Sequence, residues 1–275
     1  MPAAFPCRYG TIVPRWYSVE STFSKKTVKT CHKIKPLLAL YVYPKIKEED
    51  KERNKLEKLL VINAHPKVES DSSVSLLVLR HFLETYRKLN PGGPVEQIDL
   101  YRDHVPCIDR VFLSAQEKIK KNERLTEDEQ LPTSRMSEIL RQFKSAKKYV
   151  IAMPLHNFNV PSKLKDYIDN ILIAKETFAY TDKGSVGLLN DGRNVLVIQS
   201  SDGIYTNQDW YTEVEYSHKF LKAMFNFMGI DYQIIRAQGN YFLNRDEVLA
   251  KAFQEAESAA AFLTQLENEK KAVFD

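Results

Sequence analysis

Five short apolar runs recur from residue 58 onward, and they constrain the fold more than any other feature of the sequence. Each run is rich in β-branched residues, and most lead through a polar loop into a segment with helical spacing of apolar residues. The runs are Leu59–Asn63, Val95–Leu100, Tyr149–Met153, Asn194–Gln199 and Asp231–Arg236, of which Val95–Leu100 is recognised by its alternation of apolar and polar residues. Strands that alternate with helices pair in parallel through right-handed crossovers. The sequence therefore predicts an α/β fold in one domain, a doubly wound parallel sheet of five strands in a three-layer α/β/α arrangement.

Charge is unevenly distributed along the chain. Residues 1–47 carry nine Lys or Arg and one acid, whereas residues 48–275 carry 31 basic and 35 acidic side chains. Because the predicted domain has no basic excess, we do not expect it to bind nucleic acid. Residues 1–47 lack sustained periodicity and are interrupted by prolines, and Lys47–Lys58 is a mixed charge run typical of a solvated linker or frayed helix. We therefore predict a basic, disordered N-terminal extension and linker at 1–57 before a domain at 58–275. A transit peptide, or upstream sequence included by a misplaced start, remains an alternative.

Several classes of protein are disfavoured by the apolar runs, cysteines and histidines. The longest apolar run, Leu37–Tyr43, is far shorter than the roughly 20 residues of a membrane-spanning helix. The three cysteines lie far apart without a CxxC pair, which argues against a disulfide framework or zinc site and fits a reducing compartment. The histidines show no metal-ligand spacing. We therefore expect a cytoplasmic protein that binds no membrane and no metal.

A polar and aromatic loop follows the third apolar run. After Pro154 the sequence continues with Leu155–Asn159 (LHNFN), and a helix is predicted to begin at Pro161-Ser162. In open α/β sheets the carboxyl ends of the strands form the edge at which ligands bind. For this loop alone, however, an ordinary strand-to-helix turn is the favoured interpretation.

A cluster of serines stands where the first helix is predicted to begin, at Ser72, Ser73 and Ser75. One serine would be an ordinary helix cap. Several hydroxyls beside unpaired backbone N–H groups and the positive end of the helix dipole make an anion site. The loop has no glycines and so is neither a dinucleotide fingerprint nor a Walker loop. Capping and phosphate binding both remain open at this point.

Three loops, at residues 65–75, 154–159 and 200–205, fall at one predicted edge of the sheet. Together they resemble the FMN-dependent NADH-azoreductase family, which consists of flavodoxin-like quinone and azo-dye reductases. The most specific match is Pro154–Asn159 (PLHNFN), against the family's PMYNFN loop. Thr177–Thr181 with Gly184 and Gly187, Ser73–Ser75 and Gln199–Tyr205 also match in the family's order. The resemblance covers residues 58 to about 270.

The resemblance implies one FMN per subunit, NADH as co-substrate, and a role for each matching residue. The residues implied at the FMN phosphate end are His65, Ser73, Val74 and Ser75. Those implied to line the isoalloxazine are Leu155, His156, Asn157 and Phe158. Those implied to border the other side of the ring are Ser200, Ser201, Asp202 and Gly203. Tyr180 matches the family's aromatic residue near the flavin and the substrate cleft.

The implied activity is two-electron reduction of quinones and cleavage of azo bonds to amines, by ping-pong hydride transfer in a homodimer. No protein nucleophile is required. Two positions depart from the family: His156 replaces a Tyr or Trp, and Asp202 replaces the first of two glycines. His156 could supply a proton near neutral pH, or could merely hydrogen-bond beside the ring. An electron carrier, an NADPH-dependent FMN reductase and a flavin-free interaction module remain alternatives, and the physiological acceptor is not specified by the sequence.

Overall fold

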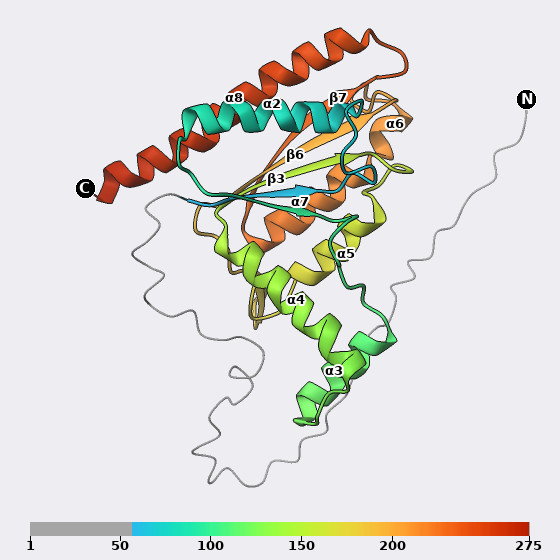
Figure 1. Cartoon of the computed structure of the whole chain (residues 1–275), viewed down its shortest axis with the longest axis vertical. Coiled ribbons are helices and arrows are strands. Elements are labelled where there is room, and N and C mark those ends of the chain that lie inside the picture. The colour runs from blue at the N-terminus through green and yellow to red at the C-terminus, as the bar shows by residue number, and fades with distance from the viewer. Residues whose placement is uncertain (1–56, 275) are drawn as a thin grey trace, which may run out of the picture. The chain divides into compact units, whose positions relative to one another are not determined.

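Five parallel strands form the centre of the fold in the computed structural model, which describes residues 57–274 (Figure 1). They are β1 (Leu59–Asn63), β2 (Val95–Asp99), β3 (Lys148–Pro154), β6 (Asn194–Ser201) and β7 (Asp231–Gln238). Their order is β2-β1-β3-β6-β7, and all four pairings are parallel. This order reverses direction between β1 and β3, as in flavodoxin-like sheets. The predicted doubly wound sheet is confirmed, whereas the predicted N-terminal extension lies outside the described residues except at its end.

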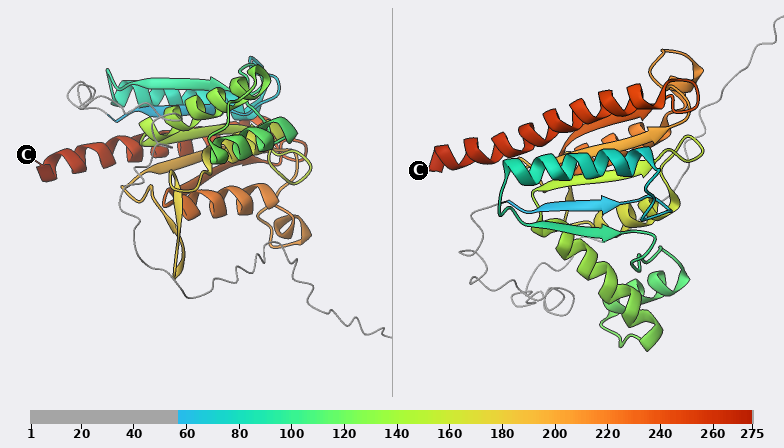
Figure 2. Two further views of the ribbon diagram at one scale, coloured as in Figure 1. Left: turned by 90° about the horizontal axis from the view of Figure 1, so that it is seen from below. Right: turned by 45° about the horizontal axis from the view of Figure 1, so that its top comes forward.

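Helices cover both faces of the sheet (Figure 2). One face carries α2 (Val74–Leu89) and α8 (Arg245–Phe274). The other carries α4 (Glu127–Ser145), α5 (Ser162–Ile171) and α7 (Tyr216–Met228). A strand enclosed on both faces is apolar at nearly every position. This explains why the central strands were visible in the sequence as continuous apolar runs.

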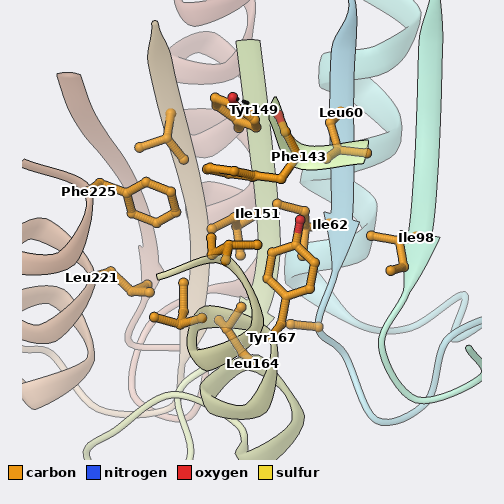
Figure 3. Close-up of a cluster of buried hydrophobic side chains, with 14 of the residues drawn as sticks. Leu60, Ile62, Ile98, Phe143, Tyr149, Ile151, Leu164, Tyr167, Leu221 and Phe225 are labelled. Atoms are coloured by element: carbon orange, nitrogen blue, oxygen red, sulfur yellow. Dashed lines mark hydrogen bonds between the residues drawn. The ribbon is translucent and has the colours of Figure 1, made fainter. Parts of the chain in front are cut away.

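The larger core lies between the sheet and α4, α5 and α7 (Figure 3). Phe143 of α4 stacks on Tyr149 of β3, with ring centroids 4.5 Å apart, and Phe225 of α7 completes the aromatic group. All three side chains are fully buried. Burial of each such ring contributes about 1.5–3 kcal/mol. This packing fixes the helices relative to the strands whose far ends carry the loops described below.

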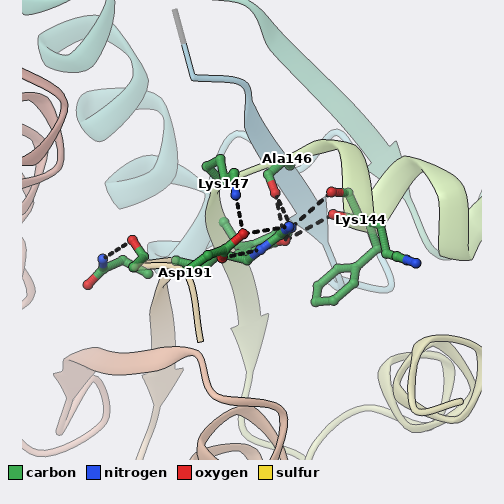
Figure 4. Close-up of polar contacts among 9 residues, drawn as sticks. Lys144, Ala146, Lys147 and Asp191 are labelled. Carbon is green, nitrogen blue, oxygen red and sulfur yellow. Dashed lines mark hydrogen bonds and ion pairs between the residues drawn. The ribbon is translucent and has the colours of Figure 1, made fainter. Parts of the chain in front are cut away.

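A buried guanidinium ties elements together at the edge where the strands begin. Arg193 donates from Nη1 to the carbonyls of Lys144 and Ala146, at 2.9 and 2.6 Å, and to the Tyr149 hydroxyl. Its Nε pairs with Asp191 at 2.8 Å. Figure 4 shows Asp191 beside Lys144 and Ala146 in this cluster. The end of α4 and the starts of β3 and β6 are thereby held together.

The alternation of strands and helices does not continue throughout the domain, contrary to the prediction. The β-prone segment after α5 forms β4 (Phe178–Thr181), which pairs antiparallel with β5 (Gly184–Gly187) apart from the main sheet. A Cβ at Gly187 would lie 2.5 Å from the carbonyl carbon of Met228. Only glycine therefore lets the hairpin pack this closely against the end of α7.

Residues 104–134, predicted to be a polar insertion with a helix at Ser114–Asn122, are mostly helical. The helix α3 spans Arg110–Lys121, and the acidic stretch after it already belongs to α4. Thr126 caps α4 by accepting from the Glu129 N–H, and the Glu129 carboxylate accepts from the Thr126 N–H at 2.8 Å. Acidic residues favour a helix N-terminus, which is why this stretch begins a helix instead of extending the loop.

Two predicted boundaries near the fourth strand were wrong. The helix predicted at Val214–Met228 begins at Tyr216 and follows a separate short helix, α6 (Trp210–Glu213), whose N-cap Asp209 accepts from two backbone N–H groups. β6 extends two residues further than predicted, to Ser201. Within the described residues, no helix combines the length and apolar character needed to cross a membrane.

Candidate functional site

The carboxyl ends of the five strands lie along one edge of the sheet, which we call the rim. The strand register places Asn63 of β1 opposite Ala152 of β3, and Pro154 opposite Ser200 of β6. The N–H of Leu155 donates to the Ser200 carbonyl at 2.8 Å. The three loops predicted to share an edge therefore do so, and the second and third are in direct contact.

His65 is fixed by the loop that follows β1. Its backbone N–H donates to Asn63 Oδ1 at 3.1 Å, and its ring Nδ1 lies 3.0 Å from both the N–H and the carbonyl oxygen of Lys67. Burial lowers the pKa of His65, and the nearby His156 adds to that effect. A neutral ring carries its proton on Nε2 when Nδ1 accepts from the Lys67 N–H, and on Nδ1 when it donates to the Lys67 carbonyl. At pH 7 this side chain is therefore a neutral polar group on the rim.

The N-terminus of α2 is not closed by its own capping residue. Ser73 occupies the N-cap position, but its side chain makes no capping hydrogen bond. Its hydroxyl lies 3.2 Å from that of Ser75, which is fully buried, and Val74 between them is also buried. First-turn N–H groups have no acceptor within the helix, and the dipole there is positive. Two hydroxyls beside such groups form a cradle for an anion.

A positive charge that the sequence analysis missed lies beside this cradle. Arg245, the first residue of α8, donates from Nη2 to the Ser72 carbonyl at 2.5 Å. α8 runs beside α2 and so brings the two residues together (Figure 1). The sequence did offer a signal for the start of α8, because Asn244 is a favoured residue before a helix. Its side chain accepts from the Asp246 N–H. No local pattern predicts which loop that helix start would reach.

The second loop turns back on itself between His156 and Asn159. The N–H of each donates to the carbonyl of the other, at 2.9 and 2.8 Å, and the central residues Asn157 and Phe158 have φ of 46° and 64°. This geometry is a type I′ turn, for which Asn-Gly is the favoured pair. A phenylalanine with positive φ costs about 1–2 kcal/mol. Such strain concentrates at ligand sites, where the surrounding structure maintains it.

Three aromatic side chains surround Phe158. The ring centroids of Tyr205, Trp210 and Tyr211 lie 6.4, 5.5 and 6.4 Å from that of Phe158, all in edge-to-face arrangements. Trp210 is nonetheless 57 % exposed. Burial raises the pKa of Tyr205, so its hydroxyl stays protonated. The sequence analysis missed Trp210 and Tyr211, for which the Asp209 cap of α6 was the available signal.

The third group of predicted residues divides between strand and loop. Ser200 and Ser201 are the buried last residues of β6, and Ser201 Oγ donates to the Gly203 carbonyl at 2.9 Å. Asn240, which follows β7, donates from Nδ2 to the Ser201 carbonyl at 2.8 Å. Asp202, between Ser201 and Gly203 in the sequence, is exposed. The end of β6 is thus braced from both sides, with a carboxylate at its tip.

Tyr180 is not brought to the rim of its own chain. It lies on β4, is 77 % exposed and packs edge-to-face on Phe178. Phe178 in turn contacts Phe227 near the end of α7, and Leu189 donates to the Met228 carbonyl. The base of the hairpin is therefore anchored at the edge where the strands begin. A role for Tyr180 beside the rim loops would need a second copy of the chain.

The rim combines an anion cradle, a strained turn with an aromatic ring, and a polar strand end. These features suit a planar ligand with a negatively charged tail. Across the part of the chain that the structure describes, no group of three or more His, Cys, Asp and Glu side chains is arranged to hold a metal ion.

Comparison with known families gives one match over most of the chain. Residues 57–260 match the model of a family described as having a flavodoxin-like fold. The match begins close to β1 and ends within α8. It therefore covers the sheet and all three rim loops.

Relatives and solved structures agree with that match. The chain is 63 % identical over 210 residues to FMN-dependent NADH:quinone oxidoreductase 1 of Bacillus cereus, covering 76 % of this chain and 99 % of the relative. It is 38 % identical to an FMN-dependent NADH:quinone oxidoreductase of Staphylococcus aureus, covering 74 % and 99 %. The crystal structure of an FMN-dependent NADH-azoreductase from Bacillus anthracis in complex with FMN is 63 % identical and has a TM-score of 0.75. The similarity covers 76 % of this chain and 100 % of that one.

Proposed function

Because the chain belongs to the family of FMN-dependent NADH:quinone oxidoreductases and azoreductases, we propose that it binds FMN at the rim and uses NADH to reduce quinones by two electrons. The observation that supports this most directly is the uncapped serine cradle on the first loop, next to the strained turn on the second. These loops leave β1 and β3, where the strand order reverses, which is the ligand position in sheets of this kind.

In the proposed complex the anion cradle holds the phosphate of FMN. The hydroxyls of Ser73 and Ser75 and the N–H of Val74 donate to it, with Arg245 supplying positive charge and His65 a further donor. In support of this assignment, the Ser73 side chain makes no capping hydrogen bond, and burial lowers the pKa of His65 so that its ring is neutral at pH 7. Charge-assisted hydrogen bonds of this kind are about twice as strong as neutral ones.

The flat ring of the cofactor then lies along the second and third loops. Leu155, His156, Asn157 and Phe158 line one side, with backbone groups of the turn at the polar edge of the ring. The residues that line the opposite side of the ring are Ser200, Ser201, Asp202 and Gly203. The aromatic side chains around Phe158 extend the side that Phe158 lines with further ring edges.

The bound cofactor supplies the chemistry, accepting a hydride from NADH and passing two electrons to a quinone or an azo compound. The protein positions these partners, and no nucleophile is needed from it. Since His156 is exposed on the rim, it can donate a proton to a reduced acceptor. One cleft serves both partners in turn, so we expect ping-pong kinetics and cleavage of azo bonds to amines. A cytoplasmic location remains a prediction from cysteine usage.

We further propose a homodimer in which Tyr180 completes the site of the other subunit. Support comes from the contacts that anchor its hairpin at the end of α7, and from the 77 % exposure of Tyr180. Exposed apolar groups that gather on one part of a surface often mark an interface. Light scattering should give a dimer mass, and a monomer with full activity would contradict this arrangement.

The first experiment is an absorbance spectrum of the purified protein before and after anaerobic NADH. We expect a flavin spectrum that NADH bleaches and a quinone restores. A colourless protein that neither binds added FMN nor oxidises NADH would refute the proposal. A flavin that binds but stays oxidised with NADH would indicate an electron carrier, and bleaching by NADPH alone would indicate the NADPH-dependent alternative.

The position of the phosphate is tested by comparing FMN with riboflavin, which lacks it. Ser73→Ala together with Ser75→Ala should weaken FMN binding by about tenfold or more, the loss expected for charge-assisted hydrogen bonds. Riboflavin binding should stay unchanged. Equal losses for both ligands would place the phosphate elsewhere.

A further inference from the structure

Four polar side chains form a connected network inside the protein, between the ends of β6 and β7 and the start of α7. Arg236 of β7 pairs with both carboxylate oxygens of Glu215, at 2.8 and 3.0 Å. Gln199 of β6 donates to the same carboxylate at 2.9 Å and accepts from the Ser217 hydroxyl at 2.7 Å. The Glu215 side chain is 4 % exposed, and Gln199 and Ser217 are buried.

This network leads directly to the strained turn of the rim. The backbone N–H of Ser217 donates to the Phe158 carbonyl at 3.1 Å. Ser217 is the second residue of α7, so its N–H has no acceptor within the helix. The carbonyl of Phe158 thus supplies that acceptor. In return, the helix holds the turn at Phe158, whose φ is 64°.

Stability alone does not account for such an arrangement. Desolvation of a buried ion pair offsets most of its attraction, and well-packed apolar side chains serve equally well. The pair instead fixes the relative orientation of the two side chains, because a bidentate guanidinium and carboxylate hold each other in one geometry. A strained turn persists only where surrounding groups determine it, and here those groups start at Glu215 and Arg236.

We propose that Glu215 and Arg236 are positioning residues, which act through Ser217 to hold the Asn157–Phe158 turn in the conformation that meets the flavin ring. The proposal rests on the proposed function for the identity of the ligand. The coupling from the ion pair to the turn is a property of the protein itself and can be measured without flavin.

The first test is hydrogen exchange in the full chain without FMN, at the backbone amides of His156 and Asn159. Glu215→Gln keeps the shape of the side chain but removes its charge. We expect at least tenfold faster exchange at both amides, and a smaller change for Arg236→Lys, which keeps the charge. The matched control is Asp191→Asn, which makes the same chemical change in the bidentate pair with Arg193 at the opposite edge. It should leave both rates within twofold of wild type.

The second test separates the backbone link from the side-chain network. Ser217→Pro removes the N–H that holds the Phe158 carbonyl and breaks no hydrogen bond within the helix, because a first-turn N–H has no acceptor there. Ser217→Ala keeps that N–H and loses only the hydroxyl. We expect Ser217→Pro to shift the visible spectrum of bound FMN, and to raise the quinone KM several-fold more than Ser217→Ala does, with a smaller effect on kcat.

The outcomes separate this proposal from the function on which it rests. Folded Glu215→Gln and Ser217→Pro proteins with wild-type exchange, FMN affinity and quinone KM would overturn the positioning role. A wild-type protein that binds no flavin would instead overturn the proposed function. In that case faster exchange in Glu215→Gln would still show the coupling, and unchanged exchange would refute it.

Discussion

Asn157 and Phe158 occupy backbone conformations that most residues avoid, so substitutions at Asn157 separate backbone strain from side-chain contacts. Its φ is 46° and its side chain is exposed. Glycine adopts this conformation freely, whereas a β-branched residue is an outlier there. We expect Asn157→Gly to change the free energy of unfolding by less than about 0.5 kcal/mol, and Asn157→Val to lower it by about 1–2 kcal/mol. Urea unfolding without FMN measures both, and equal stabilities would mean that the turn relaxes.

Gly187 is required for a different reason, since it leaves space for a neighbouring backbone. A Cβ there would lie 2.5 Å from the Met228 carbonyl carbon and 2.6 Å from the Gly229 nitrogen. Backbone atoms cannot move aside as a flexible side chain can. Gly187→Ala should therefore lower stability by about 1–3 kcal/mol in thermal unfolding. Ser185→Ala, at an exposed position on the same strand, is the control and should stay within about 0.5 kcal/mol of wild type.

At the scale of elements, one carboxylate joins α3 to α4. Glu129 accepts from Lys118 Nζ, Ser114 Oγ and the Thr126 N–H, at 2.8, 2.7 and 2.8 Å. The hydrogen bond from Lys118, with those from Thr126 and Ser114, lowers the pKa of Glu129 to about 2. Since the pKa is lower in the folded state, the stabilisation is complete above pH 4.5 and is lost as pH falls toward 2.

The corresponding experiment compares urea unfolding of wild type and Glu129→Gln between pH 5 and pH 2. The wild-type midpoint should fall more steeply, because only wild type loses the Glu129 contacts on protonation. Other carboxylates titrate in both proteins and cancel in the difference. Parallel curves would show that Glu129 does not join the two helices as described.

Prediction from sequence succeeded for elements whose signal is local. The central strands β1, β3 and β6 were recognisable because burial on both faces makes them apolar at most positions, and the rim loops followed from chain order. α6 and the β4–β5 pairing were missed, since a four-residue helix has no periodicity and the hairpin depends on Gly187 meeting α7. Arg245 and the Glu215–Arg236 pair could not be predicted either, because each acts on a loop far away in sequence.

At the scale of the whole molecule, two histidines make stability depend on pH in the range near neutrality. Burial lowers the pKa of His65 and of His218 below 6.5. The unfolded chain then binds more protons than the folded one just below pH 6.5. Stability should therefore be complete above pH 6.5 and decrease as pH falls below it. Urea midpoints at pH 5.5 and 7.5 measure the decrease, which should be smaller in His65→Gln with His218→Gln; an equal decrease would contradict this origin.

The position of α8 has a consequence for how the protein is made. Ribosomes release the chain from its N-terminus, so α8 emerges after all five strands of the sheet. Until then the apolar side of α2 that α8 covers, together with that face of β6 and β7, lacks its partner. Arg245 reaches the Ser72 loop only when this helix docks. The loop at Ser72 therefore gains the positive charge of Arg245 late in synthesis, because the strands and helices between them in the sequence must be made first.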